Sequence, residues 1–208
     1  MVRRRVRIRF RKQGDLRWIG HLDLLRAWER LLRRACVPLV MTEGCHPRPR
    51  INLLSALPMG EAGLDEMVEV DFSGPQTTAE LLAACEQSAP AGLTVTEVDE
   101  TSPVVRGAQL REMAYEVPLP AERREDVTRR VAEMIAAPTL AIARAGEPAI
   151  DLRDLLMGAD VSAGVLRFRI RASRERNLRA KDVLAALGLD DLRAGGIYPT
   201  RTQLVLES

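Results

Sequence analysis

Residues 4–11 read RRVRIRFR, and this stretch decides how the chain begins to fold. Apolar residues alternate in it with arginines, and those arginines are Arg5, Arg7, Arg9 and Arg11. A period of two is the signature of a β-strand with one buried face, because successive side chains of a strand point to opposite sides. The sequence therefore predicts a first strand with an apolar face and an arginine face.

The segments that follow this strand predict a βαββαβ order. Helical spacing of apolar residues predicts helices at 21–36 and 77–88, and further strands are expected at 38–42, 67–72 and 93–98. The same order returns with strands at 115–119, 139–143, 165–171 and 202–206 and helices at 122–136 and 180–187. We expect an α+β protein of tandem ferredoxin-like repeats, with antiparallel sheets and helices on one face. Repeat 1 spans 1–100, a linker spans 101–113, and repeat 2 spans 114–208.

The composition is that of a globular protein. The 208 residues are 46% hydrophobic and 29% charged, which excludes disorder, collagen and a coiled-coil rod. Three cysteines without a CxxC pair and without a secretory leader are expected to stay reduced. No apolar run approaches the roughly 20 residues that span a bilayer, so we expect a cytoplasmic protein.

The formal net charge of +2 hides a strong asymmetry along the chain. Residues 1–50 carry 14 Lys and Arg against 4 Asp and Glu, whereas residues 61–165 carry 8 against 20. A second basic window at 165–181 carries 7 against 1. Two basic segments therefore flank an acidic middle.

The segment 12–51 carries the most specific pattern, an HLDLxR motif followed by GxxPxP. It resembles the N-terminal signature of the radical-SAM-linked protein family, an uncharacterised domain encoded beside or fused to a radical S-adenosylmethionine protein. The matching residues are Gly14, Leu16, Ile19, His21, Leu22, Asp23, Leu24, Arg26, Leu32, Arg33, Arg34, Ala35, Pro38, Gly44, Pro47, Pro49 and Ile51. The later stretch ALPMG at 56–60 also looks like this family. Gly20 departs from the family's usual serine, and Cys45 from a common aromatic.

The resemblance implies a radical-SAM protein as partner, and RNA as the shared substrate. This chain has no CxxxCxxC cluster, so the iron–sulfur cluster and S-adenosylmethionine would belong to that partner, and we expect no cofactor in this chain.

Basic side chains on the two strands and in one loop are the candidates for binding RNA phosphate, because guanidinium groups bind phosphate bidentately. The candidates are Arg7, Arg9, Arg11, Lys12, Arg48, Arg50, Arg167, Arg169, Arg171, Arg179 and Lys181. An alternative stays open for the first strand, since Glu69 and Asp71 on a neighbouring strand could pair with its arginines across the sheet. The second row has only Glu116 on the corresponding strand, so it is the better phosphate candidate.

The loop at 44–50 is expected to carry much of the function. Its two prolines fix the backbone while Arg48 and Arg50 project between them, and rigid loops hold ligand-binding groups at low entropic cost. A plain crossover between strands is the alternative. Trp28 lies on the apolar stripe of the first helix and is expected in the core, and Trp18 is also expected to be packed.

His21 and His46 are the only histidines and the weak candidates for catalysis, since histidine titrates near neutrality. The structural alternative is that His21 packs at a helix start and His46 fills a loop. Asp23 is explained by its place in the first helical turn. The cysteines and histidines lack the spacing of a zinc site, so no metal is expected.

We therefore expect an RNA-binding accessory protein without catalysis of its own, which works with a radical-SAM enzyme in tRNA or rRNA modification or processing. Two alternatives are a metal-independent endoribonuclease and a protein–protein adaptor for that enzyme. No P-loop, dinucleotide-binding, nucleophile-elbow or HExxH motif is present.

Overall fold

The computed structural model describes residues 3–102, 108–144, 147–173 and 175–207. The chain divides into two compact units, Met1–Gln109 and Leu110–Ser208, and each is described by itself. The division falls inside the predicted linker 101–113, of which 103–107 lie outside the described residues, as does Arg174 of the second basic window.

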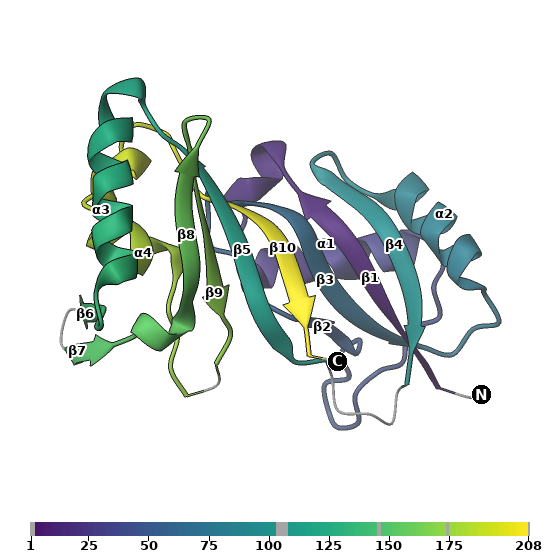
Figure 1. The fold of residues 1–208 in the computed structure, drawn as a ribbon. Helices are drawn as coiled ribbons and strands as arrows, with labels where there is room; N and C mark the ends of the chain where they lie inside the picture. Colours follow the sequence, from purple (N-terminus) through teal and green to yellow (C-terminus); the bar gives the residue numbers. More distant parts are fainter. Residues whose placement is uncertain (1–2, 103–107, 145–146, 174, 208) are drawn as a thin grey trace. The chain divides into compact units, whose positions relative to one another are not determined.

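Unit 1 is an antiparallel sheet with two helices. Its elements are β1 (Arg4–Lys12), a 3-10 turn (Gly14–Trp18), α1 (His21–Arg34), β2 (Ile51–Leu53), β3 (Ala62–Phe72), α2 (Thr78–Ser88) and β4 (Leu93–Thr101). The strand order is β4-β1-β3, with β2 on the other edge of β3 (Figure 1). The first strand therefore lies in the middle of the sheet, where both of its edges are hydrogen-bonded.

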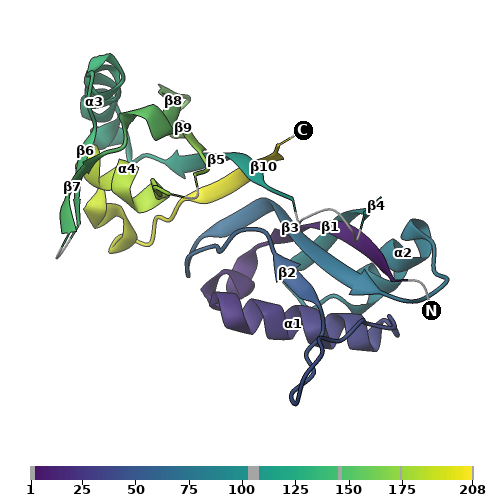
Figure 2. The same cartoon turned by 90° about the horizontal axis from the view of Figure 1, so that it is seen from below.

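The core of unit 1 lies between the apolar face of this sheet and both helices (Figure 2). Phe10 of β1 meets Trp28 of α1 edge to face, with ring centroids 5.0 Å apart. From α2, Leu81 and Cys85 enter the same cluster. Because the apolar residues of β1 all point into this core, its odd-numbered arginines lie on the helix-free face.

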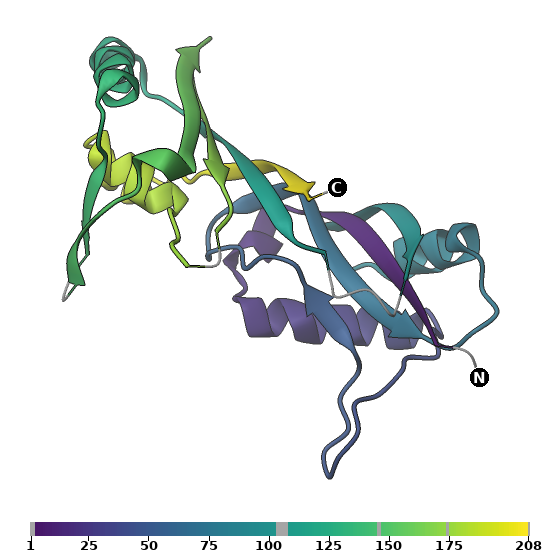
Figure 3. The same cartoon turned by 60° about the horizontal axis from the view of Figure 1, so that its bottom comes forward.

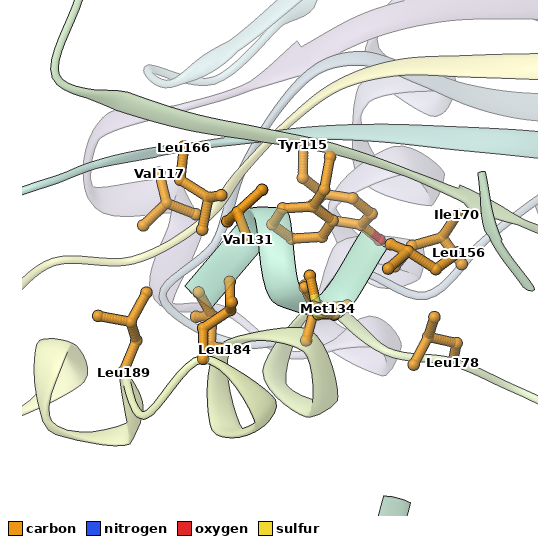
Figure 4. Close-up of a cluster of buried hydrophobic side chains, with 14 of the residues drawn as sticks. Tyr115, Val117, Val131, Met134, Leu156, Leu166, Ile170, Leu178, Leu184 and Leu189 are labelled. Carbon is orange, nitrogen blue, oxygen red and sulfur yellow. The ribbon is translucent and has the colours of Figure 1, made fainter. Parts of the chain in front are cut away.

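Unit 2 repeats the combination of antiparallel sheet and helices. Its elements are β5 (Leu110–Pro118), α3 (Arg124–Ala136), β6 (Ala141–Arg144), β7 (Glu147–Asp151), β8 (Leu156–Ser162), β9 (Val165–Arg171), α4 (Ala180–Ala186) and β10 (Thr200–Leu206). The sheet runs β10-β5-β9-β8, and β6 and β7 form a separate hairpin. Val131, Met134 and Leu184 from the helices pack on strand residues of one cluster (Figure 4). Within it, the rings of Tyr115 and Phe168 stack at 5.2 Å.

The α+β class and the antiparallel sheets are confirmed, but the second strand of each unit was placed wrongly. Residues 38–42 form only isolated bridges, and the strand that pairs with β3 is Ile51–Leu53. The predicted strand at 139–143 overlaps β6, which lies outside the main sheet, while β8 occupies that place. The sequence of β8, LMGADVS, does not alternate cleanly, and a glycine such as its Gly158 is typical of a turn or linker. No helix of the described residues is long and apolar enough to cross a membrane.

Candidate nucleic-acid interface

The arginine row of β1 is paired with carboxylates on its neighbouring strands. Arg5 Nε lies 2.7 Å from Asp71 Oδ1, and Arg7 Nη2 lies 3.1 Å from Glu69 Oε1. Arg9 bridges two strands, with Asp65 at 2.6 Å and Glu97 at 3.1 Å. The alternative in which carboxylates face this row across the sheet is therefore what the structure contains.

The ion pairs between the arginines of β1 and the carboxylates of its neighbouring strands form a ladder, and the burial of two of these carboxylates makes the ladder a part of the fold. The side chains of Asp71 and Glu69 are only 3% and 5% exposed, so their charges depend on the arginines beside them. Arg3 also contacts Asp71. The hydrogen bond to Asp71 raises the pKa of the Arg5 guanidinium, although burial acts in the opposite direction. A phosphate that approached Arg7 or Arg9 would have to compete with these carboxylates, whereas Arg11 is exposed and has no ion pair within the described residues.

Lys12 does not belong to the surface that the sequence predicted. Its side chain is buried, and Nζ donates to the carbonyl oxygens of Ile19 at 3.0 Å and Arg17 at 3.3 Å. Lys12 has the same parity along β1 as Val6, Ile8 and Phe10, and it therefore points to the helix-covered side. This lysine stabilises the turn that leads into α1.

The first part of the family signature builds the same turn. Gly14 adopts a positive φ of 57°, which favours glycine. Gly60, from the ALPMG stretch, donates its N–H to the carbonyl oxygen of Arg17 at 2.9 Å, so the ALPMG stretch contacts this turn. On α1, Asp23 pairs with Arg26 at 2.9 Å on the exposed helix surface. These contacts give the signature a structural role at the start of α1.

The second part of the signature forms a hairpin-like loop at 40–50 that projects from unit 1 (Figure 3). Thr42 holds it from both sides, because its N–H donates to the Arg48 carbonyl at 2.7 Å and its Oγ1 accepts from the Arg48 N–H at 2.9 Å. Pro47 is exposed, Pro49 forms a bridge with Met41, and Gly44 has a positive φ of 120°. The loop thus has a fixed path, as the two prolines predicted.

The side chain of Arg48 is exposed on this loop, and Arg50 at its base is half-buried. Arg50 Nε donates to the Met41 carbonyl oxygen at 3.4 Å. Neither guanidinium has a carboxylate partner among the described residues. Together with Arg11 on β1, this loop keeps predicted phosphate-binding residues of unit 1 accessible.

The two histidines lie in different segments of unit 1. His21 is the first residue of α1, and His46 lies in the loop at 40–50. Both side chains are exposed, and neither has a hydrogen bond or ion pair within the part of the chain that the structure describes. No described group therefore orients either of them as a catalytic base.

The arginine row of β9 in unit 2 is paired more loosely. Arg167 Nε lies 2.9 Å from Glu116 Oε1, and Arg169 Nη1 lies 3.3 Å from Glu112 Oε1. The arginine side chains are 40% and 58% exposed. Arg171 is exposed and has no ion pair in the described ranges. Sequence reasoning missed Glu112, although its even number places it on the same face of β5 as Glu116.

A shallow cavity of about 390 Å³ lies beside this second row. Ala114, with a small side chain, and Gly158, with none, leave room for it, while Glu116, Arg167 and Arg169 contribute charge. Farther along the chain, Arg179 Nε lies 3.5 Å from the buried carboxylate of Asp182, and Lys181 is exposed. Of the predicted cations of unit 2, Arg169, Arg171, Arg179 and Lys181 are thus exposed, and Arg167 is half-buried.

Trp28 is fully buried in the core, as predicted, but Trp18 is 42% exposed. The guanidinium of Arg17 lies 4.9 Å from the centroid of a Trp18 ring, so the exposed indole is covered in part by a cation. Trp18, which the sequence predicts to be packed, is thus only partly packed, because the 3-10 turn ends there and has no buried residue.

The three cysteines are free, with Cys36 and Cys45 exposed and Cys85 buried. Burial raises the pKa of the Cys85 thiol to about 11. Within the described residues no group of three or more His, Cys, Asp or Glu side chains is arranged to hold a metal ion.

A family described as an uncharacterized protein conserved in bacteria matches residues 5–180 of the sequence. The chain belongs to this DUF2344 family. The match covers most of unit 1 and the part of unit 2 up to residue 180, so both the loop at 40–50 and the row on β9 lie within the DUF2344 region.

Solved structures similar to this DUF2344 protein have low scores. An unknown protein from Galdieria sulphuraria is 15% identical, with 100% of both chains covered and a TM-score of 0.31. The acetolactate synthase small subunit from Thermotoga maritima is also 15% identical, with 100% of this chain and 97% of that chain covered and a TM-score of 0.29. No curated protein matches. Scores this low carry no argument about function.

Proposed function

We propose that this DUF2344 protein is an RNA-binding accessory protein, which acts with a radical-SAM enzyme in the modification or processing of tRNA or rRNA. In this proposal it contributes binding and presentation of RNA rather than a reaction of its own. Its two units would be tandem ferredoxin-like repeats, since each has its fourth strand beside its first and its third beside its second.

The observation that carries the proposal is the loop at 40–50. Its path is held by backbone hydrogen bonds and by Thr42, and it presents Arg48 to solvent without a carboxylate partner among the described residues. A pre-ordered arginine loses little conformational entropy when it binds phosphate, and its fork of donors matches two phosphate oxygens. Arg171 and Lys181 would extend such contacts in unit 2.

The radical-SAM partner enters through the resemblance of the segment 12–51 to the family linked to such enzymes. The iron–sulfur cluster and S-adenosylmethionine would be held by that partner, and this chain would deliver the RNA. Cleavage of RNA through His21 or His46 is less well supported, because neither side chain has an orienting group in the described structure.

The test is the salt dependence of binding to bulk tRNA. We expect binding at about 50 mM salt, and each phosphate contact should contribute roughly 0.7–0.9 to the slope of log affinity against log salt. Arg48→Ala should lower the slope by about one contact. The matched control is Arg33→Ala, which removes the same charge from α1, where Arg33 is paired with Glu29 at 2.7 Å.

No binding of tRNA by the wild-type protein at this salt concentration would overturn the proposal. Equal slopes for Arg48→Ala and Arg33→Ala would remove the loop from it. Binding of the partner enzyme that resists nuclease, without affinity for RNA alone, would point instead to a protein–protein adaptor.

A further inference from the structure

A polar cavity of about 220 Å³ lies at the base of the loop at 40–50, on the helix-free face of unit 1. It is lined by Arg5, Arg50, Ile51, Asn52, Glu69 and Asp71. Backbone hydrogen bonds fix its wall, because the Asp71 N–H donates to the Arg50 carbonyl at 3.0 Å and the Val40 N–H donates to the Asp71 carbonyl at 2.9 Å. The cavity is thus formed where the loop rejoins the sheet.

The alternation of β2 places Arg50 and Asn52 on the side of the sheet that faces this cavity. Ile51, between them, packs against the core on the other side. The register of β2 with β3 sets Asn52 opposite Glu69 and Ile51 opposite Val70. Asn52 of β2 and Arg50 just before it therefore face the carboxylates of β3 and Arg5 of β1.

The charges around this cavity do not balance. Asp71 is shared by Arg3 and Arg5, and Glu69 accepts from Arg7. Arg50 adds a fourth guanidinium, whose only described hydrogen bond goes to a neutral carbonyl. Among the described residues the lining itself holds two arginines and two carboxylates, but Arg3 and Arg7, outside the lining, also pair with these carboxylates, so Arg50 is left without a carboxylate partner at the accessible side. An anion with one or two negative charges would compensate the Arg50 guanidinium.

We propose that this cavity is a phosphate-binding site, in which Arg50 and the Asn52 amide donate to the phosphate oxygens while Arg5 supplies positive charge from the floor. Resting on the proposed function, the bound group is a backbone phosphate of RNA. The volume corresponds to about seven waters of the liquid, which leaves room for one phosphate group with part of its hydration shell. The loop would then contact RNA at two points, its exposed side through Arg48 and its base through this cavity.

The experiment titrates inorganic phosphate into the full-length protein and follows the amide signals of Ile51, Asn52 and Leu53 by NMR. Asn52→Asp keeps the size of the side chain and adds a negative charge to the cavity. Its matched control, Gln87→Glu, adds the same charge at an exposed position of α2. Arg50→Gln removes the unpaired guanidinium, and thermal unfolding of each variant reports whether it is folded.

We expect wild type and Gln87→Glu to show saturable shifts of these signals, and Asn52→Asp and Arg50→Gln to bind phosphate about tenfold more weakly or not at all. Equal phosphate affinity of Asn52→Asp and Gln87→Glu would overturn the proposal, as would the absence of shifts in the wild type. The experiment also distinguishes failure of the phosphate site from failure of the proposed RNA-binding function. If phosphate binds in the cavity but tRNA does not bind the protein, the site stands and the RNA assignment is wrong.

Discussion

The two units each carry a row of arginines on the helix-free face of their sheet, yet the rows differ in what holds them. In unit 1 the carboxylates that pair with Arg5 and Arg7 are buried. In unit 2 the pair of Arg167 and Glu116 is about 40% exposed on both sides, and Arg169 is 58% exposed although its partner Glu112 is buried. The same sequence pattern, arginine at every second position, therefore gives a structural ladder in one unit and an accessible charged surface in the other.

Strand register explains the looser pairing of Arg169, whereas Arg167 lies directly opposite Glu116 as the arginines of unit 1 lie opposite their carboxylates. In unit 1 the antiparallel pairing of β1 and β3 sets Arg5 opposite Asp71 and Arg7 opposite Glu69. In unit 2 the residue opposite Arg169 is Ala114, so Arg169 reaches diagonally to Glu112 at 3.3 Å. A directly opposed pair is closer than a diagonal one, and a small residue between two carboxylates leaves the arginine more open to solvent.

The largest expected effect is the loss of stability when the ion pairs of Asp71 in unit 1 are broken. Asp71→Asn should lower the free energy of unfolding by about 2–3 kcal/mol, less than the roughly 3–5 kcal/mol of a fully buried pair, because Arg3 and Arg5 keep some contact with water. Glu116→Gln in unit 2 should cost less than about 1 kcal/mol.

Urea unfolding checks this pair of variants. Both tryptophans lie in unit 1, so their fluorescence reports that unit, and circular dichroism follows the whole chain. Equal destabilisation by Asp71→Asn and Glu116→Gln would show that the two rows are held alike.

A smaller effect concerns RNA. Arg169→Ala should reduce the salt slope of tRNA binding by about one phosphate contact, whereas Arg9→Ala should leave the slope unchanged because Asp65 and Glu97 already neutralise Arg9. Affinity measured over a series of salt concentrations compares the two. A larger loss of slope for Arg9→Ala would reverse the roles that we assign to the rows.

The smallest expected effect is a loss of folding stability at acidic pH. The hydrogen bond from Arg4 lowers the pKa of Glu100 in unit 1, and backbone hydrogen bonds from Leu140 and Arg153 lower the pKa of Asp151 in unit 2. A carboxyl whose pKa is lowered by folding stabilises the protein above its ordinary pKa, and that contribution is lost as the pH falls through the lowered value.

Carbon NMR of the two carboxyl groups against pH measures these midpoints. Both should lie below the values of the unfolded chain. A midpoint at or above the unfolded value would mean that the corresponding hydrogen bonds do not persist in solution.

Much of the fold follows from the periodicity of the sequence. The odd or even position of a residue along a strand also predicts which face of the sheet it occupies. The alternation of β1 and the apolar stripe of α1 predict the first strand, the first helix and the burial of Trp28. The same alternation places Lys12 with Val6 and Ile8 on the core side, so its burial could have been predicted. Glu112 likewise shares the parity of Glu116 on β5.

The second strand of each unit could not be predicted from alternation. β2 has only three residues, too few to show a period of two, and β8 includes Gly158, a residue type that is typical of turns. The cavity at Arg50 and Asn52 depends on that short strand, because only its register with β3 brings these side chains beside Glu69 and Asp71. Because the sequence predicts this strand at 38–42, it does not predict the cavity at Arg50 and Asn52.

Arginine footprinting tests the central claim most directly. Phenylglyoxal modifies accessible guanidinium groups, and mass spectrometry of the protein with and without tRNA reports which arginines the RNA covers. We predict protection of Arg48, Arg50, Arg169 and Arg171, with Arg5 and Arg7 slow to react in both states because carboxylates hold them. Protection confined to the helix arginines Arg26, Arg33 and Arg129, or no protection by tRNA at all, would contradict the account.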